Sequence, residues 1–286
     1  MRQKRVAAVH DISGLGKCSL TVALPILSAA GLECCPIPTA VLSNHTGGFK
    51  DFTFKDLTED ILPIVSRWKE EKLIFDAIYS GYLGSTRQVD ILIETIKQLK
   101  SEKTLVVVDP VMGDNGCLYK SFSPEFPGKM RELCQCADVI TPNMTEACLM
   151  LGESYSPPPY NKDYINSILM KLGSLCKKTV VITGVSFDKK ALGAAALDVE
   201  TGAISYCFNE KIEGMHHGTG DVFCSVLVSA LTLGRDIDFA LKAAVEFTCL
   251  SIENTFDFPE LWYGVNFEGV LNRLDDILGG IHGSTV

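Results

Sequence analysis

Short apolar runs and longer amphipathic segments alternate along this chain. The short runs are rich in β-branched residues and bounded by turn residues, a pattern that predicts buried strands at residues 5–10, 34–41, 74–80, 104–109, 138–141 and 179–183. The longer segments have helical periodicity and predict helices at 18–30, 86–100, 144–151, 160–176, 220–233, 239–254 and 267–277. Because strands that alternate with helices pair in parallel and are covered on both faces, we expect an α/β fold with a mostly parallel central sheet.

The length of the chain, 286 residues of which 47% are hydrophobic, suits one compact α/β domain with a substantial core. The proline-rich stretch SYSPPPY (154–160) has strand and helix signals on either side, which indicates a stiff surface loop and not a domain linker. We therefore expect a single domain over residues 1–286.

The net charge of −9 argues against a surface that binds nucleic acid or anionic lipid, because both need basic side chains to neutralise phosphates. Eleven cysteines occur without a C-x-x-C pair, and the N-terminal segment lacks the apolar region of a signal peptide. No apolar run approaches the roughly 18–20 residues of a membrane span. These features predict a cytoplasmic protein with reduced thiols and no structural zinc.

Polar residues are concentrated where the expected strands end, at 10–11, 80–82, 109–110, 141–143 and 183–184. In open parallel sheets, ligands bind outside the carboxyl ends of the strands. We therefore expect the functional site at this edge of the sheet.

The stretch VHDISGLGKCS (9–19) has part of the pattern of a phosphate-binding loop, G-x-x-x-x-G-K-[ST]. Gly16 and Lys17 fit the pattern, but Asp11 stands where the first glycine is required and Cys18 where a hydroxyl is required. A carboxylate facing phosphates is unfavourable, so we interpret Lys17 as a solvated residue at a helix start or a partner of a flap.

The segment Gly218-Thr219-Gly220-Asp221 opens an apolar helix. Two glycines allow consecutive N–H groups to point at one anion from a helix start, where the helix dipole favours negative charge. A simple helix cap, with Asp221 in the first turn, explains the same residues equally well.

Two further motifs carry oxygen ligands. Asp109 ends a strand and Asp114 follows a turn, an arrangement suited to Mg²⁺ beside nucleotide phosphates, whereas an isolated pair of this kind is more often a pair of turn residues. Asn143 and Glu146 stand three residues apart at a helix start, which also fits a capping arrangement.

Six motifs taken together resemble the pyridoxal kinases of the ribokinase-like superfamily: SNHTGG (43–48), SGYLGS (80–85), VDPVMGD (108–114), TPNMTEA (141–147), VVITG (180–184) and GTGDVF (218–223). The resemblance implies a ribokinase-like three-layer sandwich that phosphorylates the 5′-hydroxymethyl group of pyridoxal, pyridoxine or pyridoxamine with ATP. It implies that Asp221 is the general base, and that Gly218, Thr219 and Gly220 stabilise charge on the transferred phosphoryl group.

Further roles follow from the resemblance alone. Mg²⁺ would be held by Asp109 and Glu146. The residues implied on the ATP side are Asp109, Asp114, Tyr119, Thr141, Asn143, Glu146, Thr183 and Gly220, with Asp114 and Tyr119 on a flap over the site. The residues implied on the vitamin side are His10, Asp11, Ser43, Thr46, Tyr82 and Asp221. Many pyridoxal kinases have Ser-His where this chain has His10-Asp11. A homodimer and the K⁺ requirement of some family members are further expectations.

Two other functions fit the same motifs. Hydroxymethylpyrimidine kinases act on a similar hydroxymethyl group, although Asn44-His45-Thr46 and Gly81-Tyr82 favour a B6 vitamer. A non-catalytic vitamin-binding protein on the same scaffold would have no need for Asp221.

Two residue types nearby have simple interpretations. We interpret His216 and His217 as loop residues and not as zinc ligands, and Cys117 on the flap as a solvent-facing thiol, although it could add reversibly to the aldehyde of pyridoxal.

Overall fold

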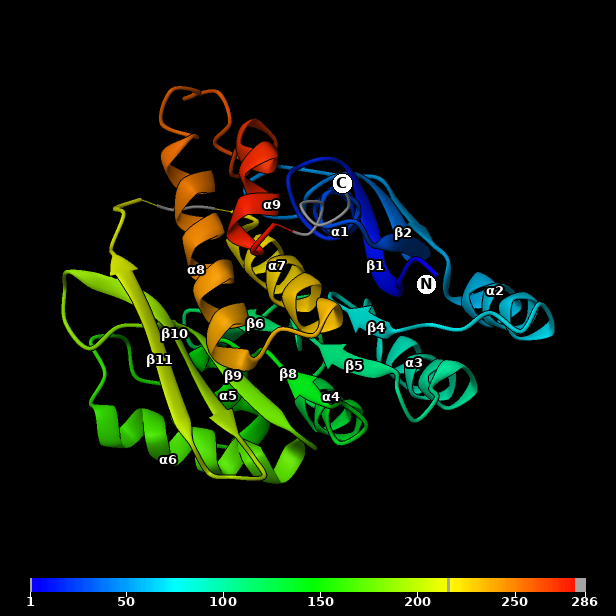
Figure 1. The fold of residues 1–286 in the computed structure, drawn as a ribbon, viewed down its shortest axis with the longest axis horizontal. Helices are drawn as coiled ribbons and strands as arrows, with labels where there is room; N and C mark the ends of the chain where they lie inside the picture. The colour runs from blue at the N-terminus through cyan, green and yellow to red at the C-terminus, as the bar shows by residue number, and fades with distance from the viewer. Residues whose placement is uncertain (1, 215–216, 281–286) are drawn as a thin grey trace.

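The computed structural model describes residues 2–214 and 217–280, and within them a central sheet lies between two helical layers (Figure 1). Among these residues nine strands form the main sheet, in the order β11-β10-β9-β8-β5-β4-β1-β2-β3. The strands are β1 (Arg5–Leu15), β2 (Glu33–Asn44), β3 (Phe54–Asp56), β4 (Ala77–Ser80), β5 (Leu105–Val108), β8 (Val139–Ile140), β9 (Thr179–Val185), β10 (Ala191–Asp198) and β11 (Ile204–Glu210). The six strands from β9 to β2 pair in parallel, and β3, β10 and β11 pair antiparallel at the two edges.

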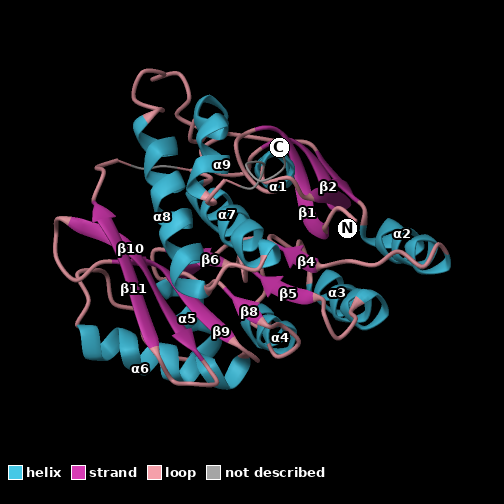
Figure 2. Ribbon diagram, in the orientation of Figure 1, coloured by secondary structure: helices cyan, strands magenta, loops and turns pink. Residues whose placement is uncertain are grey.

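Helices cover both faces of this sheet (Figure 2). They are α1 (Leu20–Ala29), α2 (Thr58–Glu70), α3 (Thr86–Leu99), α4 (Phe126–Cys134), α5 (Met144–Leu151), α6 (Lys162–Leu172), α7 (Thr219–Leu233), α8 (Ile237–Glu253) and α9 (Leu274–Ile277), with short 3₁₀ turns η1 (Gly173–Leu175) and η2 (Glu268–Arg273). A small hairpin, β6 (Gly113–Asp114) and β7 (Cys117–Leu118), stands apart from the main sheet.

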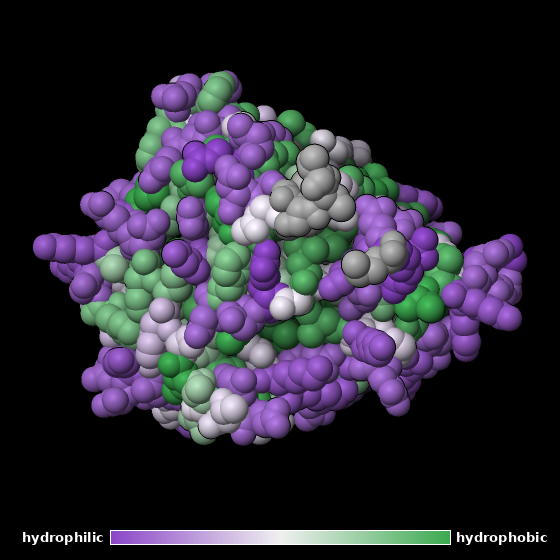
Figure 3. Space-filling model, in the orientation of Figure 1, coloured by the Kyte–Doolittle hydropathy of each residue, from purple (hydrophilic) through white to green (hydrophobic). Residues whose placement is uncertain are grey.

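The core has two halves because successive strand side chains point to opposite faces. In β1, Ala7 and Val9 join the cluster that packs under α2 to α6. Val6 and Ala8 face the other way, into the cluster under α1, α7, α8 and α9. Figure 3 shows that hydrophilic residues cover much of one face of the molecule. None of the helices described for the chain has the length and apolar character needed to cross a membrane.

The α/β class, the mostly parallel sheet and the two helical layers expected from the sequence are confirmed. The strand and helix predictions all fall on observed elements, with 160–176 split into α6 and η1, and 267–277 into η2 and α9. Five strands and two helices carried no prediction, namely β3, β6, β7, β10, β11, α2 and α4. The single-domain interpretation stays a prediction.

Candidate active site

The carboxyl ends of the parallel strands meet at one edge of the sheet. The backbone N–H of Asp109 donates to the carbonyl of Ser80 at 2.9 Å, and that of Thr183 to the carbonyl of Pro142 at 3.0 Å. These bonds bring the ends of β4, β5, β8 and β9 side by side. The polar residues that follow different strands in the sequence therefore surround one site.

Asp109 and Glu146 form a buried acidic pair at this edge, with 8% and 3% of their surfaces exposed. Burial raises the pKa of Asp109 well above its usual range, and the charges of Glu146 and Asp221 raise it further. Burial also raises the pKa of Glu146 to about 8, although backbone N–H groups of Asn143, Met112 and Gly113 oppose the shift. A cation bound beside this pair would lower both pKa values and favour loss of protons.

The Asn143–Glu146 motif is a complete capping box at the start of α5. The Asn143 Oδ1 accepts from the Glu146 N–H at 2.9 Å, and the Glu146 Oε2 accepts from the Asn143 N–H at 2.8 Å. Glu146 also accepts the N–H of Met112 at 3.1 Å, and the Asn143 Nδ2 donates to the Gly113 carbonyl at 3.0 Å. The motif therefore caps a helix and at the same time holds the base of the β6–β7 hairpin.

The oxygen atoms of this pair suit Mg²⁺. Mg²⁺ is usually bound by one or two carboxylates together with waters and substrate phosphates. One hydroxyl, that of Thr141, lowers the pKa of Asp109 by hydrogen bonding. The other lone pairs of this carboxylate can bind a cation or the waters of that cation. Among the described residues no group of three or more His, Cys, Asp or Glu side chains is placed to hold a metal ion.

The β6–β7 hairpin carries Asp114, Cys117 and, just after it, Tyr119. It is fastened to α5 where the N–H of Gly116 donates to the Thr145 hydroxyl at 2.9 Å. Asp114 and Cys117 are exposed, and Tyr119 is 40% exposed. Burial is the main cause that raises the pKa of Tyr119, and nearby negative charges raise it further, namely those of Glu146, Asp114, Asp109 and Asp221. The hairpin therefore faces the acidic edge of the sheet, as a flap would.

Asp221 stands in the first turn of α7 and is partly exposed. Burial raises the pKa of Asp221 to about 7, and the charge of Asp11 raises it while the Ser19 N–H lowers it. A carboxylate with this pKa is matched to proton transfer near neutral pH.

The turn before Asp221 is shaped for close approach. Gly218 has φ of 79°, in the left-handed region, and a Cβ there would overlap the carbonyl oxygen of Lys17. Gly220 is exposed, and a Cβ added to it would meet no atom within 4 Å. Open space beside Gly220, at the start of a helix of fifteen residues, is where the dipole favours an anion.

Lys17 is neither solvated nor a flap partner, so that interpretation was wrong. Its ammonium forms an ion pair with Glu268 and lies 5.4 Å from the centre of the Phe267 ring, and 13% of the side chain is exposed. The glycine-rich turn after β1 thus packs on the C-terminal segment. This arrangement accounts for Lys17 without a phosphate.

The residues expected on the vitamin side are not equally accessible. Ser43 and Thr46 are exposed, and Tyr82 is half-buried beside the Phe122 ring at 5.5 Å. Asp11 is only 4% exposed. His10 is fully buried, with its ring edge-on to Tyr79 at 4.4 Å and neither ring nitrogen hydrogen-bonded.

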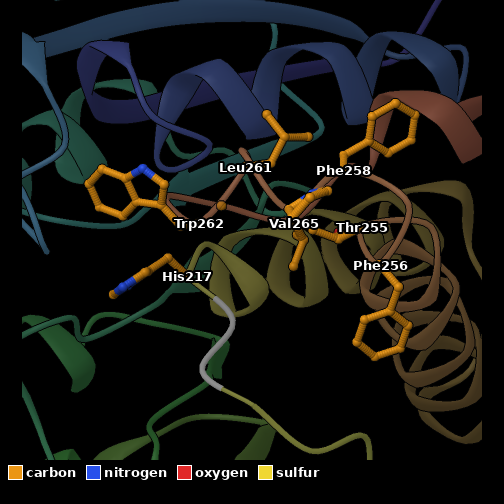
Figure 4. Close-up of a pocket in the computed structure, with 9 residues that line it drawn as sticks. His217, Thr255, Phe256, Phe258, Leu261, Trp262 and Val265 are labelled. Atoms are coloured by element: carbon orange, nitrogen blue, oxygen red, sulfur yellow. The ribbon is translucent and has the colours of Figure 1, made fainter.

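Two loops meet beside the site through His45 and His217, whose ring centres are 5.6 Å apart. Burial lowers the pKa of His45, and the neighbouring His217 lowers it further. The interpretation of His216 lies outside the described residues. His217 also lines a cavity of about 240 Å³, and Trp262, Leu261 and Phe258, from the segment after α8, contribute to its walls (Figure 4).

Sequence reasoning missed several groups around Asp221. Four residues interact with Asp11, Asp221 or Thr141, either electrostatically or by a hydrogen bond: Ser19, Cys18, Tyr79 and Cys224. Ser19 could have been noticed as a serine before a predicted helix. The pattern gives no sign that Ser19 would leave the start of α1 without a side-chain capping bond.

Comparison with known proteins places this site in a family. The family model described as Phosphomethylpyrimidine kinase matches residues 24–266. A Bacteroides thetaiotaomicron protein named as a phosphomethylpyrimidine kinase, in a crystal form with pyridoxal, is 40% identical, with 96% of each chain covered and a TM-score of 0.91. The pyridoxal kinase of Lactobacillus plantarum is 31% identical, with 99% of this chain and all of that chain covered and a TM-score of 0.88. The pyridoxine/pyridoxal/pyridoxamine kinase of Bordetella avium is 27% identical over 84% of this chain and 81% of its own length.

Gly218→Ala should destabilise the protein by about 1–3 kcal/mol, because alanine is strained at positive φ and its methyl group overlaps the Lys17 carbonyl. Gly220→Ala is the matched control, since a Cβ there has free space, and its stability should equal or slightly exceed that of the parent. Urea unfolding of both variants measures the difference. Equal stability of the two would contradict the assigned backbone geometry.

Lys17→Ala should leave the affinity for ATP nearly unchanged and should lower stability by about 0.5–1 kcal/mol, the scale of a partly exposed ion pair. Glu268→Gln should lower stability to a similar extent, because it removes the same pair. Calorimetric titration with ATP and thermal unfolding measure the two effects. If ATP binding is lost in Lys17→Ala alone, the turn after β1 is a nucleotide site after all.

Proposed function

The chain belongs to the phosphomethylpyrimidine kinase family, and we propose that it transfers the γ-phosphoryl group of ATP to the 5′-hydroxymethyl group of pyridoxal, pyridoxine or pyridoxamine. The relatives that carry a B6 kinase name, and the homologue crystallised with pyridoxal, support this substrate class. The observation that carries the proposal is the position of Asp221. A carboxylate with a pKa of about 7 lies directly behind an open, glycine-lined helix start and faces a buried acidic pair.

Asp221 is proposed as the general base. As the hydroxymethyl oxygen forms its bond to the γ-phosphorus, its proton passes to the Asp221 carboxylate, and the bond between the γ-phosphorus and the ADP oxygen breaks. Phosphoryl transfer depends mainly on positioning and charge stabilisation, so one well-placed base suffices.

Gly218, Thr219 and Gly220 are proposed to stabilise the transferred phosphoryl group. The left-handed Gly218 ends the preceding loop and lets α7 begin at Thr219. The N–H groups of a helix start have no partners within the helix and point outward. The free space beside Gly220 allows phosphate oxygens to reach them.

Asp109 and Glu146 are proposed to hold Mg²⁺ and its waters, with Thr141 and Asn143 supporting the two carboxylates. Mg²⁺ bound there supplies positive charge beside the phosphates. Asp114 and Tyr119 on the flap, and Thr183 at the end of β9, are proposed on the nucleotide side. A K⁺ requirement and a homodimer stay predictions from the resemblance, and a cytoplasmic location stays a prediction from the cysteines and the N-terminal segment.

Ser43, Thr46 and Tyr82 are proposed to hold the pyridine ring, because the first two are exposed hydroxyls at the end of β2 and the third follows β4. Asp11 and His10 follow the same edge but are closed off by burial. We therefore assign the ring contacts to the exposed hydroxyls first.

Hydroxymethylpyrimidine is the alternative substrate, favoured by the description of the matching family. Release of ADP measured with each B6 vitamer and with hydroxymethylpyrimidine decides between them. The proposal predicts turnover with at least one B6 vitamer at a kcat/KM well above that with the pyrimidine. Turnover with the pyrimidine alone would replace the B6 assignment, and release of ADP with none would favour a non-catalytic binding protein.

Asp221→Asn should lower kcat by on the order of 10²–10⁴ while the fold and ATP affinity remain, because asparagine fills the same space but accepts no proton. Single-turnover kinetics and thermal unfolding measure the two effects. A variant that turns over within a few-fold of the parent, at unchanged stability, would make Asp221 a helix cap and remove it from the mechanism.

Binding of Mg²⁺ with ADP at pH 7 should release protons. Glu146 has a pKa of about 8, so the ligand-free site retains a proton at pH 7 that a neighbouring cation displaces, and burial raises the pKa of Asp109 in the same direction. Calorimetry in two buffers of different ionisation enthalpy gives the number of protons released. Glu146→Gln should release fewer, and no release by the parent would contradict this metal site.

A further inference from the structure

The proline-rich loop (154–160) between α5 and α6 contacts the flap. Its first aromatic side chain, Tyr155, packs on the turn of the β6–β7 hairpin, because a Cβ added to Gly116 would lie 2.6 Å from Cδ1 of the Tyr155 ring. The ring is half-buried and packs against the edge of the larger core cluster. A loop that the sequence predicts only as a stiff surface connection therefore contacts the segment proposed to lie over the nucleotide.

The turn that receives the ring consists of Asn115 and Gly116, the two residues between β6 and β7. Both have positive φ, 50° and 78°, as a tight hairpin turn requires, and Asn-Gly is the sequence best suited to such a turn. Because Gly116 has no side chain, the Tyr155 ring rests directly on the backbone of the turn. A larger residue at this position would be strained and would also displace the ring.

A buried hydroxyl holds the same turn. The N–H of Gly116 donates to the Thr145 Oγ1 at 2.9 Å, and Thr145 is 2% exposed in the first turn of α5. At the base of the hairpin, a Cβ added to Gly113 would lie 3.1 Å from the Leu149 Cδ1. The flap is therefore attached to α5 at both its base and its tip.

The proline-rich loop is itself anchored at both ends. Gly152 closes α5 in the left-handed conformation. At the other end, Tyr160 is 7% exposed and its N–H donates to the Ser186 carbonyl at 2.7 Å. Three consecutive prolines, 157–159, restrict the backbone between these anchors. Tyr155 is thus presented to the flap by a stiff segment.

The position of the turn determines the position of Asp114. One carboxylate oxygen of Asp114 accepts the Asn115 N–H at 2.8 Å, and the other accepts the Asn115 Nδ2 at 3.0 Å. Tyr119 is held nearer the base, where its N–H donates to the Met112 carbonyl at 2.9 Å. A displacement of the turn would therefore move Asp114 more than Tyr119.

We propose that Tyr155 is a positioning residue for the flap: its ring, together with the Thr145 hydroxyl, keeps the hairpin turn in place and so keeps Asp114 beside the nucleotide. This role rests on the proposed function, in which the flap lies over ATP. A hairpin that is fixed before ATP binds loses less conformational entropy on binding, so its fixation favours nucleotide affinity. The proposed vitamin side, at the end of β2 and after β4, does not involve this contact.

The test compares the parent with Tyr155→Ala. The KM for ATP should rise about three- to tenfold, while the KM for the best B6 vitamer should stay within roughly twofold, because the flap is on the nucleotide side. The Kd for ADP with Mg²⁺, measured by calorimetry, should rise by a similar factor. Tyr155→Phe should restore the parent values, since the ring and not the hydroxyl makes the contact.

Tyr206→Ala is the matched control. Tyr206 is also half-buried and packs against the same core cluster, but it lies on β11 at an edge of the main sheet, beside the Phe187 and Phe208 rings. Its loss should lower stability without changing the KM for ATP. Equal rises in the KM for ATP in the two variants, or no rise in Tyr155→Ala, would overturn the proposal.

Hydrogen exchange in the ligand-free protein needs no turnover. The Gly116 amide should exchange roughly three- to tenfold faster in Tyr155→Ala than in the parent. Thr145→Val removes the acceptor of this N–H and should accelerate the same exchange, so it serves if Tyr155→Ala does not fold.

The outcomes separate this role from the proposed function. If the parent phosphorylates no vitamer, but Tyr155→Ala accelerates exchange at Gly116 and weakens ADP binding, the proposed function alone is refuted. Unchanged exchange at Gly116, or unchanged affinity for ADP, refutes the role of Tyr155.

Discussion

The gathering of buried carboxyl groups at one edge of a parallel sheet is the constraint on which the rest of this molecule depends. Asp109, Glu146 and Asp11 are buried there, and Asp221 stands partly exposed in the first turn of α7. Desolvation raises the pKa of each of these four carboxyl groups. Hydrogen bonds from backbone N–H groups and hydroxyls partly offset the desolvation of these carboxyl groups. A cation and a substrate that donates a proton are the natural ligands of the carboxylate oxygens that have no such donor.

The loops around that edge are organised to keep these groups in place. The Asn143–Glu146 capping box also fixes the flap, and the Lys17 carbonyl lies directly against Gly218, just before the start of α7. The ion pair of Lys17 with Glu268 fastens the same turn to the C-terminal segment. Residues that are distant in sequence therefore hold the backbone around Asp221 in place.

The sequence predicts the parallel strands because valine and isoleucine dominate runs such as 105–108 and 179–182. It fails at β10, where ALGAAALD lacks that signature and the strand forms through pairing with its neighbours, and at α2, where Pro63 interrupts the helical pattern. The candidate residues at the strand ends could be found because the edge is fixed by topology. The role of Lys17 could not, since it depends on contacts with Glu268 and Phe267, which are distant in sequence.

A crystal structure with ADP, Mg²⁺ and pyridoxine tests the central claim most directly. The account predicts that the 5′-hydroxyl oxygen lies within hydrogen-bonding distance of Asp221, about 2.6–3.2 Å, and points toward the helix start at Gly220. It also predicts the ring beside Ser43, Thr46 and Tyr82. A vitamin bound elsewhere, or one whose hydroxymethyl group faces away from Asp221, would contradict the account.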